Sequence, residues 1–260
     1  MSRTIERLTG KEDHVFDFII RTFRGQIDSS EPKRRDQLVD SAYQITRFRD
    51  QLLVDPDKLA QLIETIGLLR ASSGPGTVIT EKYLIRELSC LMYDCVSRLL
   101  QKPADADAEA FNEEESVPDH EVVYRAVLEH LVAFARDSLS FKRPRDSFGR
   151  QRRAEAFSLL TQACKVLDFP DIFDLSQQML TDKKSGREVG SALEFLEVYF
   201  SYTDEPISDE LEALLKEFVS RTGYRSSAAG ALKILVITNC ISELGALNRI
   251  DDWKEAHQYF

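Results

Sequence analysis

Apolar side chains recur at intervals of three or four residues along most of the chain, and strictly alternating stretches are almost absent. The first spacing gathers apolar residues on one face of an α-helix, whereas a half-buried β-strand needs alternation. Phe16, Ile20 and Phe23, for example, share one face of a helix over residues 12–25. The pattern therefore predicts an all-α protein.

Capping and breaking residues divide this pattern into separate amphipathic helices. Gly25 is expected at the C-terminus of the first helix, because glycine readily adopts the left-handed conformation of a C-cap. Ser30 and Thr80 are expected N-caps, and Pro32 suits a first turn, where its missing N–H costs nothing. The predicted helices cover residues 12–25, 29–53, 55–70, 80–101, 118–139, 152–169, 170–182, 187–202, 208–223 and 227–247.

Successive amphipathic helices joined by short turns favour stacked antiparallel helix pairs. Two segments, which begin at Asp57 and Asp209, share the pattern Asp-x-Leu-x-x-Leu, and each precedes a long helix that carries a cysteine. This short match suggests an α-solenoid of HEAT or armadillo type, in which repeated helix pairs stack on one another. A more compact, irregular helical bundle is the alternative, because any amphipathic helix with an Asp cap produces the same pattern.

The composition changes abruptly in the middle of the chain. Residues 103–117 hold six acidic and no basic side chains, with Ala and Pro among them. Such a composition favours a flexible linker or loop. We therefore expect an N-terminal helical segment over residues 1–102 and a C-terminal helical segment over residues 118–260, packed together as one continuous helical body.

Basic residues cluster at the starts of two predicted helices, although the chain carries a formal net charge of −10. Cations there oppose the helix dipole, and free N–H groups at a helix start attract anions. The clusters are therefore candidate sites for a phosphate group or an acidic partner segment; the alternative is that they are solvated or paired with the acidic linker. The candidate residues are Lys33, Arg34 and Arg35 in the first cluster, and Lys142, Arg143, Arg145, Arg150, Arg152 and Arg153 in the second.

Residue types suited to catalysis or metal binding are present, but they do not fall into recognised motifs. None of the four histidines belongs to an H-E-x-x-H motif, and the turn SSGPGT lacks the lysine of a P-loop. Cys90 and Cys95 are separated more widely than the usual zinc-binding pair. We therefore expect no enzyme activity, no cofactor and no metal. We expect all four cysteines to be buried free thiols within helical patterns.

Three aromatic side chains follow the final predicted helix, namely Trp253, Tyr259 and Phe260. Exposed aromatic residues often dominate interface energies, so these residues are candidate anchors for a protein partner. The alternative is that Trp253 packs down and closes the end of the core.

These patterns favour a non-enzymatic helical adaptor or scaffold that binds protein partners within a larger assembly. The alternative is a helical protein associated with nucleic acid through its basic helix starts, which is less favoured because few aromatic residues interleave with the basic ones. The longest apolar run is too short to span a bilayer, so no membrane association is expected. We expect a cytoplasmic location, with the nucleus as the alternative because PKRR and KRPR are short basic clusters.

Overall fold

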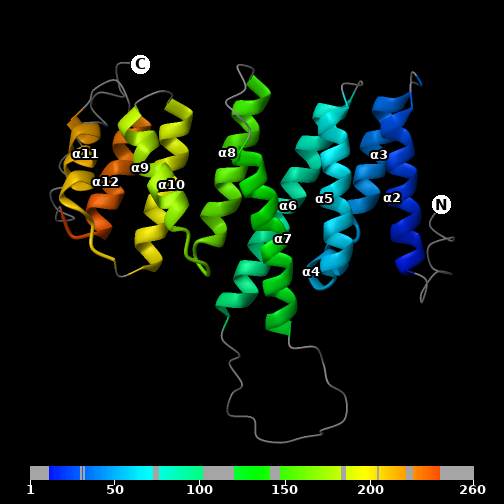
Figure 1. Cartoon of the computed structure of the whole chain (residues 1–260), viewed down its shortest axis with the longest axis horizontal. Helices are drawn as coiled ribbons and strands as arrows, with labels where there is room; N and C mark the ends of the chain where they lie inside the picture. The colour runs from blue at the N-terminus through cyan, green and yellow to red at the C-terminus, as the bar shows by residue number, and fades with distance from the viewer. Residues whose placement is uncertain are drawn as a thin grey trace, which may run out of the picture. The chain divides into compact units, whose positions relative to one another are not determined.

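The computed structural model describes residues 12–29, 31, 33–72, 76–101, 120–140, 147–182, 186–203, 205–220 and 225–240. These residues form eleven helices and no β-strand, which confirms the all-α prediction (Figure 1). The helices are Glu12–Asp28 (α2), Arg34–Thr46 (α3), Arg49–Val54 (α4), Pro56–Ala71 (α5), Thr77–Leu100 (α6), His120–Ser140 (α7), Ser147–Ala163 (α8), Pro170–Asp182 (α9), Gly186–Tyr202 (α10), Asp209–Ser220 (α11) and Arg225–Ile237 (α12).

The chain divides into two compact units, Met1–Phe134 and Ala135–Phe260. The division falls inside α7, so this helix supplies residues to both units. The predicted linker over residues 103–117 lies outside the described residues. The expected segments on either side of it therefore stay predictions.

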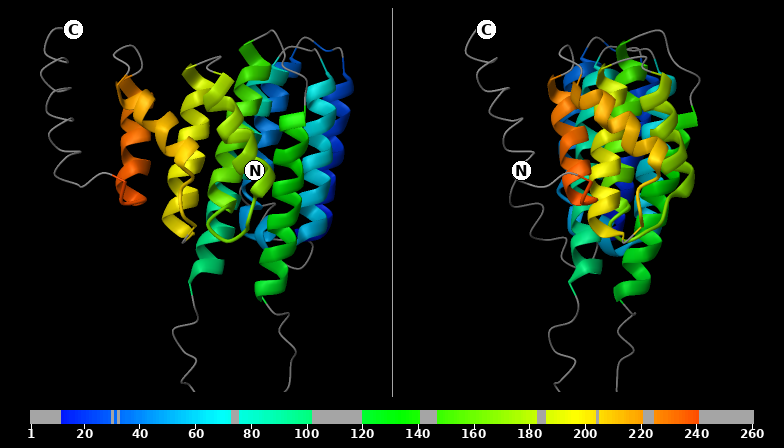
Figure 2. Two further views of the ribbon diagram at one scale, coloured as in Figure 1. Left: turned by 60° about the vertical axis from the view of Figure 1, so that its left-hand side comes forward. Right: turned by 90° about the vertical axis from the view of Figure 1, so that its left-hand side faces the viewer.

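The first unit contains two layers of helices. α2 packs against α3 and α5, and α6 packs against α3, α4 and α5, so that α2 and α5 form one layer and α3 and α6 the other (Figure 2). Phe16, Leu62 and Leu88 are among the fully buried side chains of its core. Stacked helix pairs produce this arrangement, which fits both an α-solenoid and a helical bundle.

The second unit is organised around α10, which packs against α8, α9 and α12, while α11 packs against α12 and α9. Aromatic rings fill its core: Phe195 lies 6.4 Å from Phe157 and 6.1 Å from Tyr199, measured between ring centroids. Such pairs contribute about 0.5–1.5 kcal/mol beyond the burial of their area. Gly230 of α12 permits a close approach to α10, because a Cβ at this position would lie 3.2 Å from the Cβ of Leu193.

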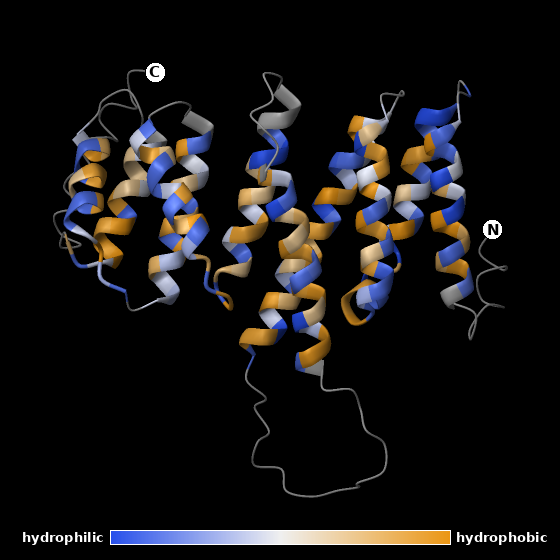
Figure 3. Cartoon of the chain, viewed as in Figure 1, coloured by the Kyte–Doolittle hydropathy of each residue, from blue (hydrophilic) through white to orange (hydrophobic). Residues whose placement is uncertain are grey.

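The apolar face predicted for the first helix is buried as expected. Phe16, Ile20 and Phe23 are each at most 2% exposed. Coloured by hydropathy, the helices carry both apolar and polar residues along their length (Figure 3). The helical spacing of apolar residues in α2 therefore identified its core side correctly.

Several predicted helix ends are wrong. The helix expected over residues 152–169 is Ser147–Ala163 (α8), so Arg152 and Arg153 lie in its second turn and not at its start. α2 continues through Gly25 to Asp28, because Ile27 extends its buried face by another turn. α6 begins at Thr77, before the predicted cap Thr80, whose hydroxyl donates back to the Gly76 carbonyl at 2.9 Å. Gly76 is the true N-cap and has a φ of +82°, a conformation that glycine adopts without strain.

The long helix predicted over residues 29–53 is also wrong, because the structure divides it into α3 and α4. The chain turns at Arg47 and Phe48. The Phe48 ring packs edge-on against Phe16, with 5.5 Å between ring centroids. The Phe48 ring thus packs against α2 at the point where the predicted continuous helix is interrupted. Ser30 and Pro32, the predicted cap and first turn, lie outside the described residues.

The final apolar helix is shorter than predicted. α12 ends at Ile237, well before the expected end at residue 247. Asn239 follows with a φ of 59°, a left-handed conformation in which asparagine often ends helices. The N–H of Cys240 then donates to the carbonyl of Leu235 at 2.8 Å. The helix therefore closes here, and residues 241–247 lie outside the described residues.

Candidate partner-binding face

Arg34, a candidate from the first basic cluster, is only 8% exposed. Its Nη2 donates to the carbonyl of Ile27 in the last turn of α2. The same Nη2 lies 2.6 Å from the hydroxyl of Ser72, the residue that follows α5. Carbonyls in a last helical turn lack intrahelical partners and carry partial negative charge. Arg34 therefore closes the end of α2 and links it to the end of α5.

Arg153, from the second cluster, is placed in a similar way. It lies in α8, and its Nη1 donates to the carbonyl of Leu139 in the last turn of α7 at 3.4 Å. Its Nε also lies 3.9 Å from the Glu188 carboxylate of α10. Both side chains are less than one fifth exposed. Arg153 therefore joins three helix segments within the second unit.

Lys33 and Arg35 are the exposed members of the first cluster. Lys33 is the N-cap of α3 and makes no side-chain capping hydrogen bond. The backbone of Arg35 abuts Gly76 at the start of α6, where an added Cβ would lie 2.8 Å from the Arg35 Cα. The starts of α3 and α6 are therefore in direct contact.

The structure describes less of the other candidates. Arg152 is half-buried in α8 and interacts with other groups of the protein. Arg150 also belongs to α8, but its side chain is not described. Roles of these residues in partner or anion binding stay predictions. Outside the described residues lie Lys142, Arg143, Arg145, Trp253, Tyr259 and Phe260.

An exposed stripe along α6 combines cationic and apolar side chains that sequence reasoning missed. Ile79, Tyr93 and Leu100 are 49%, 59% and 43% exposed, although each is large and apolar or aromatic. Lys82 and Arg86 are exposed between them. We call these five residues the α6 stripe; their spacings follow one face of a helix.

Residues of α3 extend this stripe across the layer. Tyr43 is 58% exposed, and Arg47 at the end of α3 is also exposed. α3 and α6 lie side by side, because their starts touch and because Arg49 Nε, just beyond α3, donates to a Glu87 oxygen at 3.1 Å. We call Tyr43, Arg47 and the α6 stripe together the α3–α6 face. Exposed Asp36 and Asp40 lie on the α3 side of it.

Two of the three acidic residues of α6 are engaged by arginines of neighbouring helices, and the third, Asp94, is half-buried. Glu81 is buried and accepts a hydrogen bond from Arg70 Nε of α5 at 2.8 Å. Glu87 binds Arg49, and this hydrogen bond raises the pKa of Arg49 above its usual value. Among the residues that the structure describes, Lys82 and Arg86 take part in no ion pair. The stripe is therefore locally cationic in an acidic protein.

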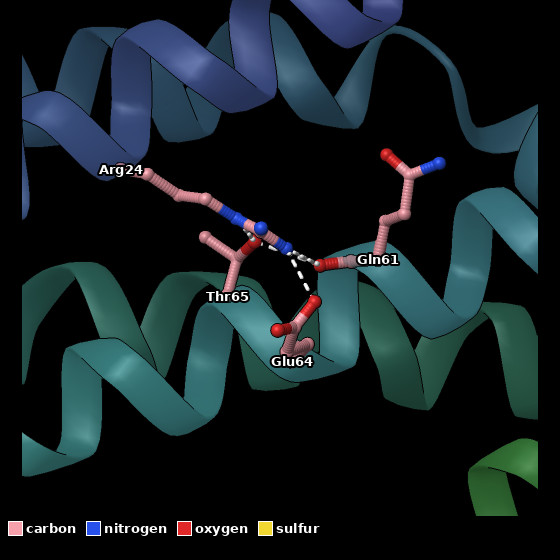
Figure 4. Close-up of polar contacts among 4 residues, drawn as sticks. All are labelled: Arg24, Gln61, Glu64 and Thr65. Carbon is pink, nitrogen blue, oxygen red and sulfur yellow. Dashed lines mark hydrogen bonds and ion pairs between the residues drawn. The ribbon is translucent and has the colours of Figure 1, made fainter.

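In the opposite layer, the side chain of Arg24 links α2 to α5 (Figure 4). Arg24 Nε donates to the hydroxyl of the fully buried Thr65 at 3.0 Å. Its Nη2 lies 2.7 Å from a Glu64 oxygen and 3.3 Å from the carbonyl of Gln61. One guanidinium thus binds three positions on α5, which holds the supporting layer in register.

The two buried thiols, Cys95 and Cys164, have low reactivity. Burial raises the pKa of both Cys95 and Cys164 to about 12. The thiol of Cys95 also donates to the carbonyl of Tyr124 at 3.0 Å. Because the thiolate is the nucleophile and the metal ligand, such groups are unreactive near neutral pH. No cluster of three or more His, Cys, Asp or Glu side chains suited to a metal occurs within the described part of the chain.

No protein-family model, curated protein or solved structure matches this chain. Among the helices that the structure describes, none combines the length and apolar character needed to cross a membrane.

Proposed function

We propose that this protein is a helical adaptor or scaffold that binds a protein partner through the α3–α6 face. Two exposed tyrosines and three exposed cations on the adjacent helices α3 and α6 carry this proposal. Tyrosine and arginine are enriched among the residues that dominate protein–protein binding energies. Tyrosine also gains contact area at a small cost in conformational entropy, because it has only two side-chain torsions.

The helices that carry this face are held together by buried contacts, which suits a binding surface. Arg70 and Glu81 form an ion pair whose side chains are 10% and 5% exposed, and the Arg70 guanidinium lies 4.6 Å from the centre of the Phe134 ring. These contacts bind α5, α6 and the first part of α7 to one another. A surface that is already ordered loses less entropy on binding, so it supports higher affinity.

Association with nucleic acid is the second candidate function. Arg47, Lys82 and Arg86 lie near two tyrosines, and single strands bind where cations accompany aromatic stacking surfaces. Asp36 and Asp40 on the α3 side weigh against this function, because they would repel phosphates. Protein binding is therefore the better-supported proposal.

The test compares the full-length chain with a double variant, Tyr43→Ala with Tyr93→Ala. Affinity capture with quantitative mass spectrometry identifies partners, and each enriched partner is then purified so that its Kd can be measured directly. Truncation of two central aromatic residues is expected to weaken binding of the relevant partner at least tenfold. Helical circular dichroism verifies that the double variant is folded.

Phe18→Ala is the matched control, because Phe18 is 69% exposed on α2 in the other layer. This control variant is expected to bind every partner as the wild type does. Equal Kd values for the double variant and the wild type would contradict the proposed function.

A further inference from the structure

We infer that the partner of the α6 stripe is an acidic peptide segment with apolar anchor residues. This inference rests on the proposed function and specifies the chemistry of the partner. It follows from the charge, the apolar exposure and the length of the stripe.

Charge is the first argument. Lys82 and Arg86 project from consecutive turns of α6 without an acidic partner among the described residues, while Glu81 and Glu87 are engaged by Arg70 and Arg49. The whole chain carries a net charge of −10, so the stripe is opposite in charge to the molecule as a whole and attracts an acidic segment. Complementary charge of this kind sets the register of a bound segment and raises its association rate.

Apolar exposure is the second argument. Ile79 lies on one side of the two cations along α6, and Tyr93 and Leu100 lie on the other. Each of the three exposes over two fifths of its surface, which favours burial against an apolar side chain of a partner. A fully hydrophilic acidic segment would leave these three residues uncovered. The partner therefore needs apolar anchors at both ends of its acidic part.

The length of the stripe sets the length of the segment. At a rise of about 1.5 Å per residue, the helix from Ile79 to Leu100 is about 32 Å long. An extended peptide rises about 3.3 Å per residue, so about ten residues cover the stripe. The two cations lie on consecutive turns near the Ile79 end. Acidic residues of the segment should therefore cluster near one of its ends.

A nucleic acid fits the stripe less well than such a peptide. A single strand carries a phosphate at every nucleotide and requires cations along the whole of its path. Beyond Arg86, the stripe continues only through Tyr93 and Leu100. A segment with a short acidic part near one end and apolar residues on both sides of that part matches this distribution.

The experiment selects a random 12-residue peptide library, displayed on phage, against the immobilised full-length protein. The same selection is made on a charge-reversed variant, Lys82→Glu with Arg86→Glu, and on Arg21→Glu, whose exposed arginine lies on α2 in the other layer. Wild type and Arg21→Glu are expected to enrich peptides that hold two or more Asp or Glu together with Leu, Ile or Phe. The charge-reversed variant is expected to lose these peptides.

Synthetic copies of the enriched peptides are then measured by fluorescence polarisation. The charge-reversed variant is expected to bind them at least tenfold more weakly than the wild type, and wild-type binding is expected to weaken as salt rises from 50 to 300 mM. Tyr93→Ala is expected to weaken binding without changing the slope of this salt dependence. Circular dichroism verifies that each variant is folded.

Five outcomes overturn the inference. The first two are enrichment of peptides without acidic residues and equal binding by the charge-reversed variant. The next two are tighter binding of a single-stranded oligonucleotide and tighter binding of a peptide with the sequence of residues 103–117. The last is self-association of the chain in ultracentrifugation that the charge-reversed variant loses. The proposed function fails separately, because it requires loss of a protein partner when Tyr43 and Tyr93 are truncated. If the tyrosine variant loses that partner while the charge-reversed variant binds it fully, the proposed function stands. Only the inference that the partner is an acidic segment is then refuted.

Discussion

At the scale of single residues, Arg34 and Arg153 show what two arginines of the basic clusters do in the fold. Each guanidinium donates to a carbonyl in the last turn of the preceding helix, at Ile27 and Leu139 respectively. Arg34 is the first residue of α3, so its unfavourable position relative to the dipole of its own helix is offset by a favourable position at the end of another. Arg153 lies in the second turn of α8, beyond the helix start that the sequence predicted for it. The sequence showed the basic clusters but not this partner, because the partner depends on how the chain turns between helices.

Replacing Arg34 by methionine is expected to lower the free energy of unfolding by about 2–3 kcal/mol, because a buried carbonyl and the Ser72 hydroxyl lose a charged donor. The neighbouring Arg35→Met is the control, since Arg35 is exposed, and it should change stability by less than about 0.5 kcal/mol. Urea unfolding followed by circular dichroism gives both values. Equal stabilities of the two variants would show that Arg34 does not stabilise the fold.

At the scale of elements, the existence of helices was more predictable than their ends. The helix expected over residues 170–182 is confirmed as Pro170–Asp182, and the one expected over residues 55–70 is confirmed as Pro56–Ala71. Both begin with a proline that marks the first turn. The errors at Gly25 and Gly76 arise because glycine occurs both inside helices and at their ends. Tertiary packing decides between these uses, and the sequence pattern alone does not.

Alanine at the two glycines is expected to have opposite effects on stability. Gly76→Ala should lower the free energy of unfolding by about 1–3 kcal/mol, because the residue has positive φ and its Cβ would meet the Arg35 backbone. Gly25→Ala should raise it by about 0.5–1 kcal/mol, because Gly25 lies inside α2 with open space around it. Urea denaturation measures both changes, and changes of the same sign would refute the assigned backbone roles.

At the scale of the whole molecule, fold class was predictable and the candidate binding face was not. An all-α chain follows from apolar spacing, which is a local property. Exposure of Tyr43 and Tyr93 is not local, because it depends on which side of α3 and α6 the neighbouring helices cover. In the sequence, both tyrosines look like ordinary members of an amphipathic helix. The basic clusters were the more conspicuous sequence pattern, but the structure shows that Arg34 and Arg153 link helices within the fold.

One cysteine in each compact unit provides a test of the whole molecule. Cys95 and Cys164 are buried with pKa values near 12, so only about one part in ten thousand is thiolate at pH 8. Ellman's reagent at pH 8 is expected to label the half-buried Cys90 and Cys240 and to spare the other two in the native protein.

Peptide mapping during a urea titration then reports the unfolding of each unit through its own buried thiol. Labelling of Cys95 should follow loss of the first unit, and labelling of Cys164 should follow loss of the second. Rapid labelling of either thiol without urea would contradict its burial. Cys90→Ala with Cys240→Ala is the control variant, and it should show no native labelling.

The contacts of Arg34 and Arg153 have a consequence for synthesis of the chain on the ribosome. Each joins residues close in sequence, because Arg34 reaches back only seven positions to Ile27, and Arg153 reaches Leu139 fourteen positions earlier. Contacts so local can form as soon as the second residue leaves the exit tunnel, before the later helices have emerged. Each of these two helices is thus closed at its C-terminal end by a side chain of the next one, in the order in which the ribosome delivers them.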